Sequence, residues 1–367
     1  MREAPGQNQI EINLLGGGNA YGEAILIHLG YDKWVVVDSL KNPDTKSSVI
    51  LEYFKEIGKD PNVINLIVAT HWHDDHIKGI SDIYDSSNCS FSISQALPRE
   101  YMAKLISLDE FKESENSGLN EFGNVIRRSI ERGEPLTRAI QNRPLLELNI
   151  EKCIIKVTAL SPSDRSIEVF EQELAKILND AYDMNLACKK VSPNHSSIVL
   201  LIQINNTKIL LGADLEINAD QNMGWSQVCK SSSLPTGKNI EVFKIPHHGS
   251  ENGHYDSLWQ NFIVKDHIAI LTPYGRGRKK LPSVKDQERI LGTSPKSYIT
   301  SKSSESSKPK KRDPKVNKIL KELSYKVTER KFTFGHIQLR RPVNSKIGGN
   351  WEILLHGNAR RLRDFNL

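Results

Sequence analysis

The chain alternates between short runs of branched apolar residues and stretches in which apolar residues recur at helical spacing. Four short runs, at residues 9–16, 23–29, 33–38 and 63–70, are bounded by glycine turns or polar segments and predict β-strands. Residues 47–58, between the third and fourth runs, carry apolar side chains at helical spacing. We therefore predict a hairpin-like opening, then one helix, then a strand that ends in a polar loop.

The middle of the chain has a different pattern. Residues 99–148 are charged, helical in period and poor in branched apolar runs, and Ile154–Leu160 returns to a strand pattern. Asp164–Lys189 again has an apolar stripe at helical spacing, which is typical of a helix that packs on a core. We interpret residues 99–190 as a helical insertion within a single domain that spans residues 1–367.

Strands and helices alternate again in the second half of the chain. The pattern predicts strands at 198–203, 208–213, 240–245 and 268–272, and helices near 215–230 and 254–264. Alternation of this kind favours an α/β protein. The fold that accommodates it is an αββα sandwich, in which two mixed sheets pack together and helices cover the outside.

The most specific motif follows the strand predicted at 63–70. His71, His73, Asp75 and His76 form the pattern H-x-H-x-D-H in the loop directly after it. Neutral imidazole nitrogens and carboxylate oxygens are the usual protein ligands of Zn²⁺ and similar ions. In a tight loop, His71 and His73 can reach one ion, while Asp75 and His76 reach a second beside it. Paired ions suit hydrolysis, because they clamp both the attacking and the leaving oxygen.

Further polar side chains lie at other predicted strand ends. Asp214 ends one strand, the sequence Pro246-His247-His248-Gly249-Ser250 follows the next, and His195 precedes a third. Sheets of α/β proteins carry functional side chains on such loops, because the rigid strands hold the loops in place. We therefore expect these side chains to join the histidine-rich loop in one site.

In order and spacing, these motifs resemble the metallo-β-lactamase fold, and more closely the metallo-β-lactamase-like domain of ComEC-type competence proteins. The resemblance spans residues 10–340 and includes a glycine-rich start, Val37-Asp38-Ser39, the H-x-H-x-D-H loop, Asn194-His195-Ser196-Ser197, Gly212-Ala213-Asp214 and Pro246-His247-His248-Gly249-Ser250. It implies a metal-dependent hydrolase with that fold.

Three positions depart from the pattern of the competence proteins. Glu23 stands nearest to the Asp that they carry near the start, Leu281-Pro282 stands where they carry His-Pro, and His195 replaces an Asn. Many other metallo-β-lactamase enzymes bind metal through a His on that loop. His195 is therefore either a ligand or a hydrogen-bonded strand residue.

The resemblance implies a dinuclear centre with two divalent ions, Zn²⁺ or alternatively Mn²⁺. The ligands implied are His71, His73, Asp75, His76, His195, Asp214 and His247. Asp214 would bridge the ions and, with Asp75, place the hydroxide that attacks phosphorus. Whichever of His247 and His248 does not bind metal, taken here as His248, would steady the developing charge or protonate the leaving oxygen. Ser250 would donate to a phosphate oxygen or cap the following helix.

Length and composition are those of a globular enzyme without a spanning helix. The 367 residues suffice for a substantial core, and no apolar stretch approaches the roughly 20 residues that a spanning helix needs. The first residues lack the basic and apolar regions of a secretory signal, and the four cysteines form no C-x-x-C pair. We therefore expect a cytoplasmic protein, and we exclude DNA import by this polypeptide alone.

Positive charge concentrates in one part of the chain. Residues 276–315 carry 13 Lys or Arg against 4 Asp or Glu, a net of +9, so the rest of a chain of net charge +6 has −3. A basic tract on an otherwise mildly acidic protein favours nucleic acid as the partner. The substrate-binding cations predicted after a strand end are Arg276, Arg278, Lys279 and Lys280. Residues 301–315 predict a mobile basic loop, which either contacts nucleic acid or is simply solvated.

Three classes of function remain open. The first is a metal-dependent phosphodiesterase or nuclease acting on DNA or RNA, which the P-H-H-G-S sequence and the basic tract favour. The second is a hydrolase of a small ester, such as a cyclic nucleotide, a phosphocholine ester, a lactone or a thioester. The third is a metal-bound scaffold without turnover, which only the missing late His-Pro suggests. The residues do not indicate protein partners, oligomeric state or pathway.

Overall fold

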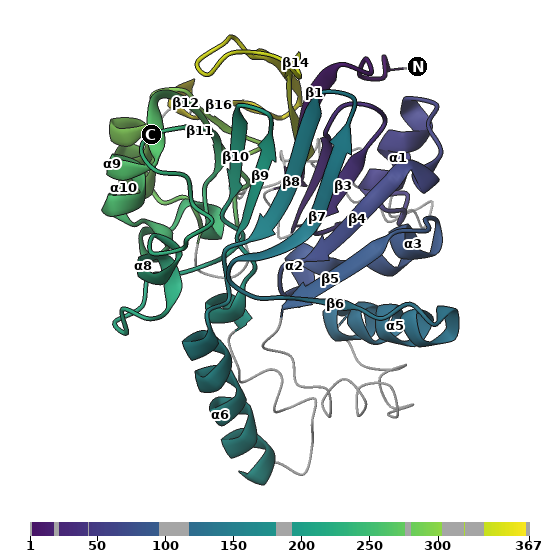
Figure 1. Cartoon of the computed structure of the whole chain (residues 1–367), viewed down its shortest axis with the longest axis vertical. Coiled ribbons are helices and arrows are strands. Elements are labelled where there is room, and N and C mark those ends of the chain that lie inside the picture. The colour runs from purple at the N-terminus through teal and green to yellow at the C-terminus, as the bar shows by residue number, and fades with distance from the viewer. Residues whose placement is uncertain are drawn as a thin grey trace.

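The computed structural model shows two β-sheets packed face to face between layers of helices (Figure 1). It describes residues 2–17, 22–42, 44–94, 117–180, 193–275, 280–302, 319 and 334–364. Each sheet has eight strands and mixes antiparallel with parallel pairs. The αββα sandwich predicted from the sequence is therefore confirmed for this part of the chain.

The first sheet has the strand order β15-β14-β1-β2-β3-β4-β5-β6. Its strands are β1 (Gln9–Gly17), β2 (Gly22–His28), β3 (Trp34–Val37), β4 (Ile64–Ala69), β5 (Ser90–Ser94), β6 (Thr137–Ala139), β14 (Phe334–Pro342) and β15 (Glu352–Gly357). The strands from β15 to β3 pair antiparallel, whereas those from β3 to β6 pair parallel. The carboxyl ends of the parallel strands therefore meet at one edge.

The second sheet has the order β16-β13-β12-β11-β10-β9-β8-β7. Its strands are β7 (Arg143–Ile150), β8 (Cys153–Ala159), β9 (Leu200–Ile204), β10 (Thr207–Leu211), β11 (Ile240–Lys244), β12 (Ile263–Leu271), β13 (Ser297–Ile299) and β16 (Arg360–Arg361). Here β10 to β13 pair parallel and the flanking strands antiparallel. This sheet too gathers the carboxyl ends of its parallel strands at one edge.

Helices cover both outer faces of the sandwich (Figure 1). The α-helices are α1 (Val49–Glu56), α2 (Asp74–Ile77), α3 (Ile80–Asp85), α5 (Ser117–Arg132), α6 (Asp164–Asp180), α8 (Gly224–Val228), α9 (Asp256–Asn261) and α10 (Val284–Thr293). The short 3-10 turns are η1 (Pro61–Val63), η3 (Pro193–Ser196), η4 (His247–Gly249), η5 (Glu251–Gly253) and η6 (Leu362–Asp364). In Figure 1, α1, α3 and α5 lie beside the first sheet, and α8, α9 and α10 lie beside the second.

The core consists of three apolar layers, one between the sheets and one under each set of helices. The central layer joins residues such as Val35 and Val68 of the first sheet to Ile202 and Val242 of the second. Each fully buried apolar side chain of this size stabilises the fold by about 1.5–3 kcal/mol relative to an exposed one. The rigid strands that result hold the loops at their ends.

The structure differs from the predicted helical insertion over residues 99–190. Residues 137–159 form β6, β7 and β8, which are strands of the two core sheets. The helical pattern holds for α5 and α6, and residues 99–116 and 181–190 lie outside the described ranges. The alternation in β7 is hard to recognise because this edge strand is partly exposed along its length. Of the helix predicted near 215–230, only α8 forms.

Two smaller expectations concern the surface of the molecule. No helix in the described part of the chain is both long and apolar enough to cross a bilayer. Trp72, between two histidines of the motif, is buried against Phe170 of α6, with ring centroids 5.4 Å apart. This tryptophan therefore packs the histidine-rich loop against α6.

Candidate metal centre

The histidine-rich loop and two loops of the second sheet meet at one end of the sandwich. β4 ends just before His71, β10 ends just before Asp214, and β11 ends at Lys244, shortly before His248. His71 Nε2 lies 4.0 Å from Asp214 Oδ2, although the two residues come from different sheets. The site is therefore built across the gap between the sheets, at the carboxyl ends of their parallel strands.

A first group of candidate ligands consists of His71, His73 and Asp214. His71 Nε2 lies 3.1 Å from His73 Nδ1. One ligand atom from each of the three residues lies within 4.8 Å of the other two. Two nitrogens bound to one tetrahedral zinc ion at about 2.0 Å lie roughly 3.3 Å apart, so this spacing fits a shared ion.

A second group consists of Asp75, His76 and His248. Asp75 Oδ2 lies 3.3 Å from His248 Nε2 and 3.9 Å from His76 Nε2. Asp214 also contacts this group, because its Oδ1 lies 3.4 Å from His76 Nε2 and its Oδ2 lies 3.7 Å from His248 Nε2. The Asp214 carboxylate therefore stands between the two groups, which is the position of a bridging ligand.

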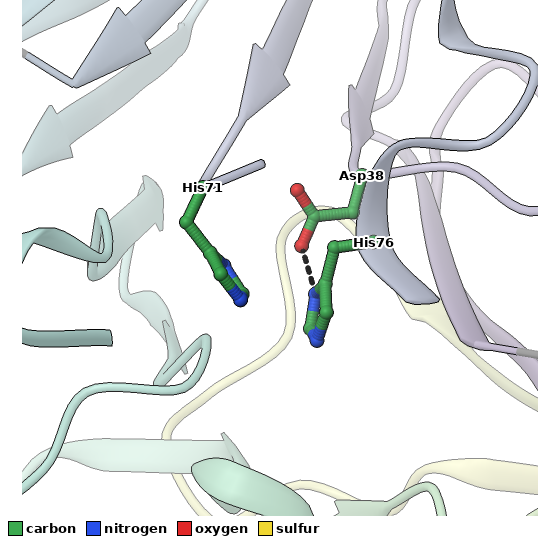
Figure 2. A group of neighbouring side chains, drawn as sticks. All are labelled: Asp38, His71 and His76. Carbon is green, nitrogen blue, oxygen red and sulfur yellow. Dashed lines mark hydrogen bonds and ion pairs between the residues drawn. The ribbon is translucent and has the colours of Figure 1, made fainter. Parts of the chain in front are cut away.

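Three of the candidate imidazoles are oriented through their Nδ1 nitrogen. His76 Nδ1 lies 2.7 Å from Asp38 Oδ2, as the dashed line in Figure 2 marks, and His71 Nδ1 lies 2.9 Å from the Thr70 hydroxyl. His248 Nδ1 lies 3.2 Å from the Thr272 carbonyl oxygen. Partners of this kind fix the tautomer and the ring orientation of metal-binding histidines. They leave Nε2 of all three rings directed at the centre.

Asp38 itself is fixed by the histidine-rich loop. Its Oδ1 accepts a hydrogen bond of 2.8 Å from the Thr70 backbone N–H, and its Oδ2 accepts one of 2.7 Å from the Thr70 hydroxyl. With His76 also bound to Oδ2, this carboxylate is fully engaged. Asp38 therefore supports the ligands rather than offering itself to an ion.

The donor set fits divalent cations. Three buried polar atoms of the cluster have no hydrogen-bond partner among the described residues, namely His76 Nε2, His248 Nε2 and Asp214 Oδ1. Leaving a buried polar group unpaired costs about 1–3 kcal/mol, so native structures rarely accumulate them. All three face the same small region. Nitrogen and carboxylate oxygen are also the ligand atoms that Zn²⁺ and Mn²⁺ accept.

The electrostatics of the cluster are dominated by its buried carboxylates. Burial would lower the pKa of His76, but Asp214, Glu23 and Asp38 raise it well above the usual imidazole value. Burial would raise the pKa of Asp214, but the charges of His76 and His248 hold it well below its usual value. A cation that binds here must displace protons from these imidazoles. Metal affinity should therefore fall as the pH falls.

Backbone geometry allows the loops to approach so closely. Gly22, at the start of β2, has φ of +96°, and a Cβ added there would lie 2.0 Å from the Asp75 carbonyl oxygen. Ala213, His247 and His248 also have positive φ, at 43°, 45° and 52°. Such conformations cost non-glycine residues about 1–3 kcal/mol each and cluster at functional sites. The strain here lies in the two loops that carry Asp214 and His248.

Of the two adjacent histidines, His248 and not His247 lies among the candidate ligands. His248 joins the second ligand group, whereas His247 is in none of the groups found among the described residues. His247 Nδ1 instead lies 2.9 Å from Asn252 Oδ1 and 3.2 Å from Glu216 Oε1. Because the two histidines follow each other in left-handed conformation, their rings point to different sides. His247 is therefore anchored at the rim of the centre.

Two further predicted residues lie outside the ligand groups. His195 is half-buried in η3, and its buried Nδ1 has no hydrogen-bond partner among the described residues. Its neighbour Asn194 donates a hydrogen bond of 2.9 Å to Glu216 Oε1, the carboxylate that anchors His247. Ser250 precedes η5, and its side chain makes no capping hydrogen bond there. His195 therefore borders the centre through its neighbour Asn194.

The predicted substrate-binding cations are only partly described. Arg276, Arg278 and Lys279 lie outside the described ranges, and Lys280 is exposed. The residues that flank this segment, Tyr274 and Leu281, are joined by two backbone hydrogen bonds of 2.8 Å. The Tyr274 ring lies 5.3 Å from the His248 ring, measured between centroids. The segment therefore leaves and rejoins the described structure beside the candidate ligands. Residues 303–315 of the predicted basic loop are also outside the described ranges.

Three residues that support the candidate ligands, Thr70, Thr272 and Lys244, were not predicted from the sequence. Thr70 and Thr272 immediately follow strands, and nothing in their type marks them as partners of histidines. Lys244 offered a signal, because a lysine between Phe243 and Ile245 interrupts an otherwise apolar run. Lys244 is fully buried in the structure, so this charged residue must have a buried partner.

Comparisons with known proteins agree with this architecture. Residues 17–113, which contain β2 to β5 and the histidine-rich loop, match the family model of the metallo-beta-lactamase superfamily. Together with the two mixed sheets and their outer helices, this match identifies the fold as the metallo-β-lactamase fold. The matched segment contains His71, His73, Asp75 and His76, which belong to the groups of side chains that could hold a metal ion. No curated protein matches the chain in sequence.

Solved structures that are similar to this chain share little sequence with it. A B3 metallo-beta-lactamase with an active-site glutamic acid is 16% identical, with a TM-score of 0.30, and the match covers 60% of this chain and 65% of that one, just under two thirds. Igni18, a metallo hydrolase from the archaeon Ignicoccus hospitalis, is 12% identical over 88% of this chain and 98% of its own, with a TM-score of 0.36. YhfI from Bacillus subtilis, a metallo-beta-lactamase fold protein, is 12% identical over 64% and 70%, with a TM-score of 0.31.

Proposed function

We propose that this protein is a metal-dependent phosphodiesterase that hydrolyses DNA or RNA at a centre of two divalent ions, Zn²⁺ or Mn²⁺. The observation that carries the proposal is the position of Asp214 between two groups of candidate ligands. Its Oδ2 lies 4.0 Å from His71 Nε2 of one group and 3.7 Å from His248 Nε2 of the other, and its Oδ1 lies 3.4 Å from His76 Nε2. One group is His71 with His73, and the other is Asp75, His76 and His248. A shared carboxylate between two such groups supports a dinuclear rather than a mononuclear centre.

The cluster would bind and orient the reacting groups. Bound divalent ions polarise a phosphoryl oxygen and supply an activated water at neutral pH. Asp75 and Asp214, both with pKa values held below the usual range, are ionised and can accept a hydrogen bond from that water. Asp38 and Thr272 keep the His76 and His248 rings in place, so that the centre is organised before substrate arrives.

His247 would contact the substrate rather than the ions. Its Nδ1 is held by Asn252 and Glu216, which leaves Nε2 as the nitrogen available to a phosphate or leaving oxygen. The side chain is 19% exposed, whereas that of His248 is 3% exposed, so His247 is the more accessible of the pair. We assign it the role first expected of His248, namely steadying charge on the substrate oxygen.

The argument for nucleic acid rests on charge beside the centre. Residues 276–315 carry a net charge of +9, and the first cations of that tract lie in sequence between Tyr274 and Leu281. The Tyr274 ring lies 5.3 Å from the His248 ring, and Tyr274 and Leu281 are joined by backbone hydrogen bonds. A nucleic acid strand that crosses this edge would be neutralised by these cations. The P-H-H-G-S sequence, which resembles that of ComEC-type competence proteins, also favours a nucleic acid substrate. A small-ester hydrolase is the alternative, and a scaffold without turnover would retain metal but show no hydrolysis.

The test compares binding of a polynucleotide with turnover of a small phosphodiester. Changing Arg276, Arg278, Lys279 and Lys280 to Gln should flatten the slope of log affinity against log salt by about two to three units. Hydrolysis of a small generic phosphodiester should hardly change, because the candidate ligands are untouched. The matched control changes four exposed lysines at the opposite end of the sandwich, Lys152, Lys238, Lys265 and Lys346, to Gln.

The control variant should keep the salt slope of the wild type. Equal slopes of log affinity against log salt for the two variants would contradict a nucleic acid substrate and favour a small ester. A wild type that binds metal but hydrolyses neither substrate would favour the scaffold.

A further inference from the structure

Lys244, the last residue of β11, places a fully buried ammonium group under the candidate metal centre. Its side chain is 0% exposed, and Nζ lies 2.5 Å from Glu23 Oε1. Glu23 lies in β2 of the other sheet and is 1% exposed. The ion pair therefore bridges the two sheets directly below the loops that carry the ligands.

Lys244 also ties together the two ligand loops of the second sheet. Its Nζ donates a hydrogen bond of 3.1 Å to the Ala213 carbonyl oxygen, immediately before Asp214. The same oxygen accepts a hydrogen bond of 3.0 Å from the His247 backbone N–H. The Gly212 N–H donates to the Lys244 carbonyl oxygen at 3.1 Å. The Asp214 loop and the His248 loop are therefore joined through one lysine.

Glu23 extends this network to the histidines. Its Oε2 accepts a short hydrogen bond from the Thr272 hydroxyl. The carbonyl and hydroxyl oxygens of Thr272 each lie 3.2 Å from His248 Nδ1. Glu23 Oε1 lies 3.7 Å from His76 Nδ1. One carboxylate thus contacts Lys244, the group that orients His248, and the ring of His76.

Stability alone is a poor explanation for this pair. Taking two charges out of water costs several kcal/mol per ion, and apolar residues of similar volume often stabilise a core as well or better. Lys244 shares its face of β11 with Val242, which lies in the apolar layer between the sheets, and this layer would accommodate such a replacement. The ligand loops, in contrast, gain fixed partners that no apolar side chain could provide.

We propose that Lys244 and Glu23 are positioning residues of the metal centre, which hold the Asp214 and His248 loops in their metal-binding arrangement while cancelling each other's charge. The inference rests on the metal-binding part of the proposed function and not on its substrate. In this arrangement, removing either partner leaves one buried charge beside the ligands. The burial penalty opposes both ionised forms, yet Lys244 keeps a raised pKa because of Glu23, and Glu23 keeps a lowered pKa because of Lys244.

The experiment measures metal affinity, not turnover, for Glu23→Gln. Zn²⁺ affinity is obtained by competition with a chromophoric chelator, and Co²⁺ absorption reports the coordination geometry. Loss of a partner that orients metal ligands typically lowers metal affinity by about 10- to 100-fold, and we expect that range with an altered Co²⁺ spectrum. The conservative variant Glu23→Asp, which keeps the charge, should recover part of the affinity.

The matched control is Glu241→Gln at the other end of β11. Glu241 is 3% exposed and pairs with buried Arg341 at 3.1 Å, so the two glutamates are similarly buried and similarly paired across the sheets. Glu241→Gln should lower the thermal stability but leave Zn²⁺ affinity and the Co²⁺ spectrum unchanged. Equal losses of affinity in Glu23→Gln and Glu241→Gln would overturn the proposal, because they would indicate a general effect of stability.

A second variant decides the matter if Glu23→Gln does not fold. Thr272→Val keeps the size of the side chain and removes the hydroxyl that links Glu23 to His248. We expect it to fold and to bind Zn²⁺ at least several-fold more weakly at the His248 group. Wild-type affinity in Thr272→Val would contradict the proposal. If the wild-type protein binds neither Zn²⁺ nor Mn²⁺, both the proposed metal centre and this inference are wrong.

Discussion

Each end of β11 carries a buried ion pair to the first sheet, and the two pairs differ in what they contact. At its start, Glu241 pairs with Arg341 of the first sheet, and at its end, Lys244 pairs with Glu23 of that sheet. The Glu241 pair makes its further contacts with neighbouring residues outside the candidate metal centre. The Gly348 N–H donates to Glu241, Arg341 donates to the Lys346 carbonyl oxygen, and the guanidinium lies 4.9 Å from the Trp351 ring centroid.

The Lys244 pair is connected instead to loops in strained conformations. Ala213 and His248, which flank or form part of the candidate ligand set, have positive φ. Both ends contain buried polar atoms without hydrogen-bond partners among the described residues, such as Glu241 Oε2 at one end and His76 Nε2 at the other. Within the described residues, those at the Lys244 end belong to groups of candidate metal ligands, whereas Glu241 belongs to none. A buried ion pair is therefore not by itself a sign of function. What surrounds it distinguishes the end that closes the sandwich from the end that can bind metal.

The largest effect should follow from Asp214→Asn at the metal end. Losing the carboxylate that faces both ligand groups should abolish binding of at least one ion. Because metal ions contribute several kcal/mol to transition-state stabilisation, hydrolysis should fall about a thousandfold or more. Metal content and turnover are measured together, and circular dichroism checks the fold. Asp266→Asn, at an exposed carboxylate of the opposite end, should leave both unchanged.

Removing one partner of the Glu241 pair should affect stability alone. Arg341→Met leaves the Glu241 carboxylate buried without its cation, which typically costs about 3–5 kcal/mol in the free energy of unfolding. Urea denaturation of the metal-free protein measures this cost. Arg341→Met combined with Glu241→Leu should recover most of it. A fall in metal affinity in Arg341→Met would show that the two ends are coupled.

A pH effect should also distinguish the two ends of β2, which carries Glu23 near the metal end and His28 at the other. Burial lowers the pKa of His28 to about 4. At neutral pH the His28 imidazole is neutral in both the folded and the unfolded protein. Below pH 6.5 it binds a proton in the unfolded protein but stays neutral in the folded protein. Stability should therefore fall between pH 6.5 and 4, by about 3 kcal/mol. His28→Gln should show a smaller fall over this range, and identical curves would contradict the assignment.

The smallest effect concerns His195, at the rim of the centre. If its unpartnered ring contributes to the His71 group, His195→Asn should lower Zn²⁺ affinity by about tenfold, equivalent to about 1.4 kcal/mol, and leave the KM for substrate nearly unchanged. Chelator competition measures the affinity. An unchanged affinity and stoichiometry would make His195 an ordinary residue of η3.

The sequence predicts the sandwich and most of the candidate ligands, because both depend on local patterns. The H-x-H-x-D-H loop and Asp214 directly follow apolar runs, and strand ends of parallel sheets converge. The choice between His247 and His248 could not be made, because it depends on left-handed backbone angles of adjacent residues. The pairing of Lys244 with Glu23 depends on how the sheets face each other. The strand β8 was predicted from its apolar run, whereas β6 and β7 were not, because they are edge strands and their apolar pattern is weak.

The central claim is that this end of the sandwich binds two metal ions on either side of Asp214. Anomalous scattering from crystals grown with zinc, recorded on both sides of the zinc absorption edge, tests it most directly. We predict two peaks about 3.5–4 Å apart, one beside His71 and His73 and the other beside Asp75, His76 and His248. A single peak would contradict the dinuclear centre, and no peak at this end of the molecule would contradict the account as a whole.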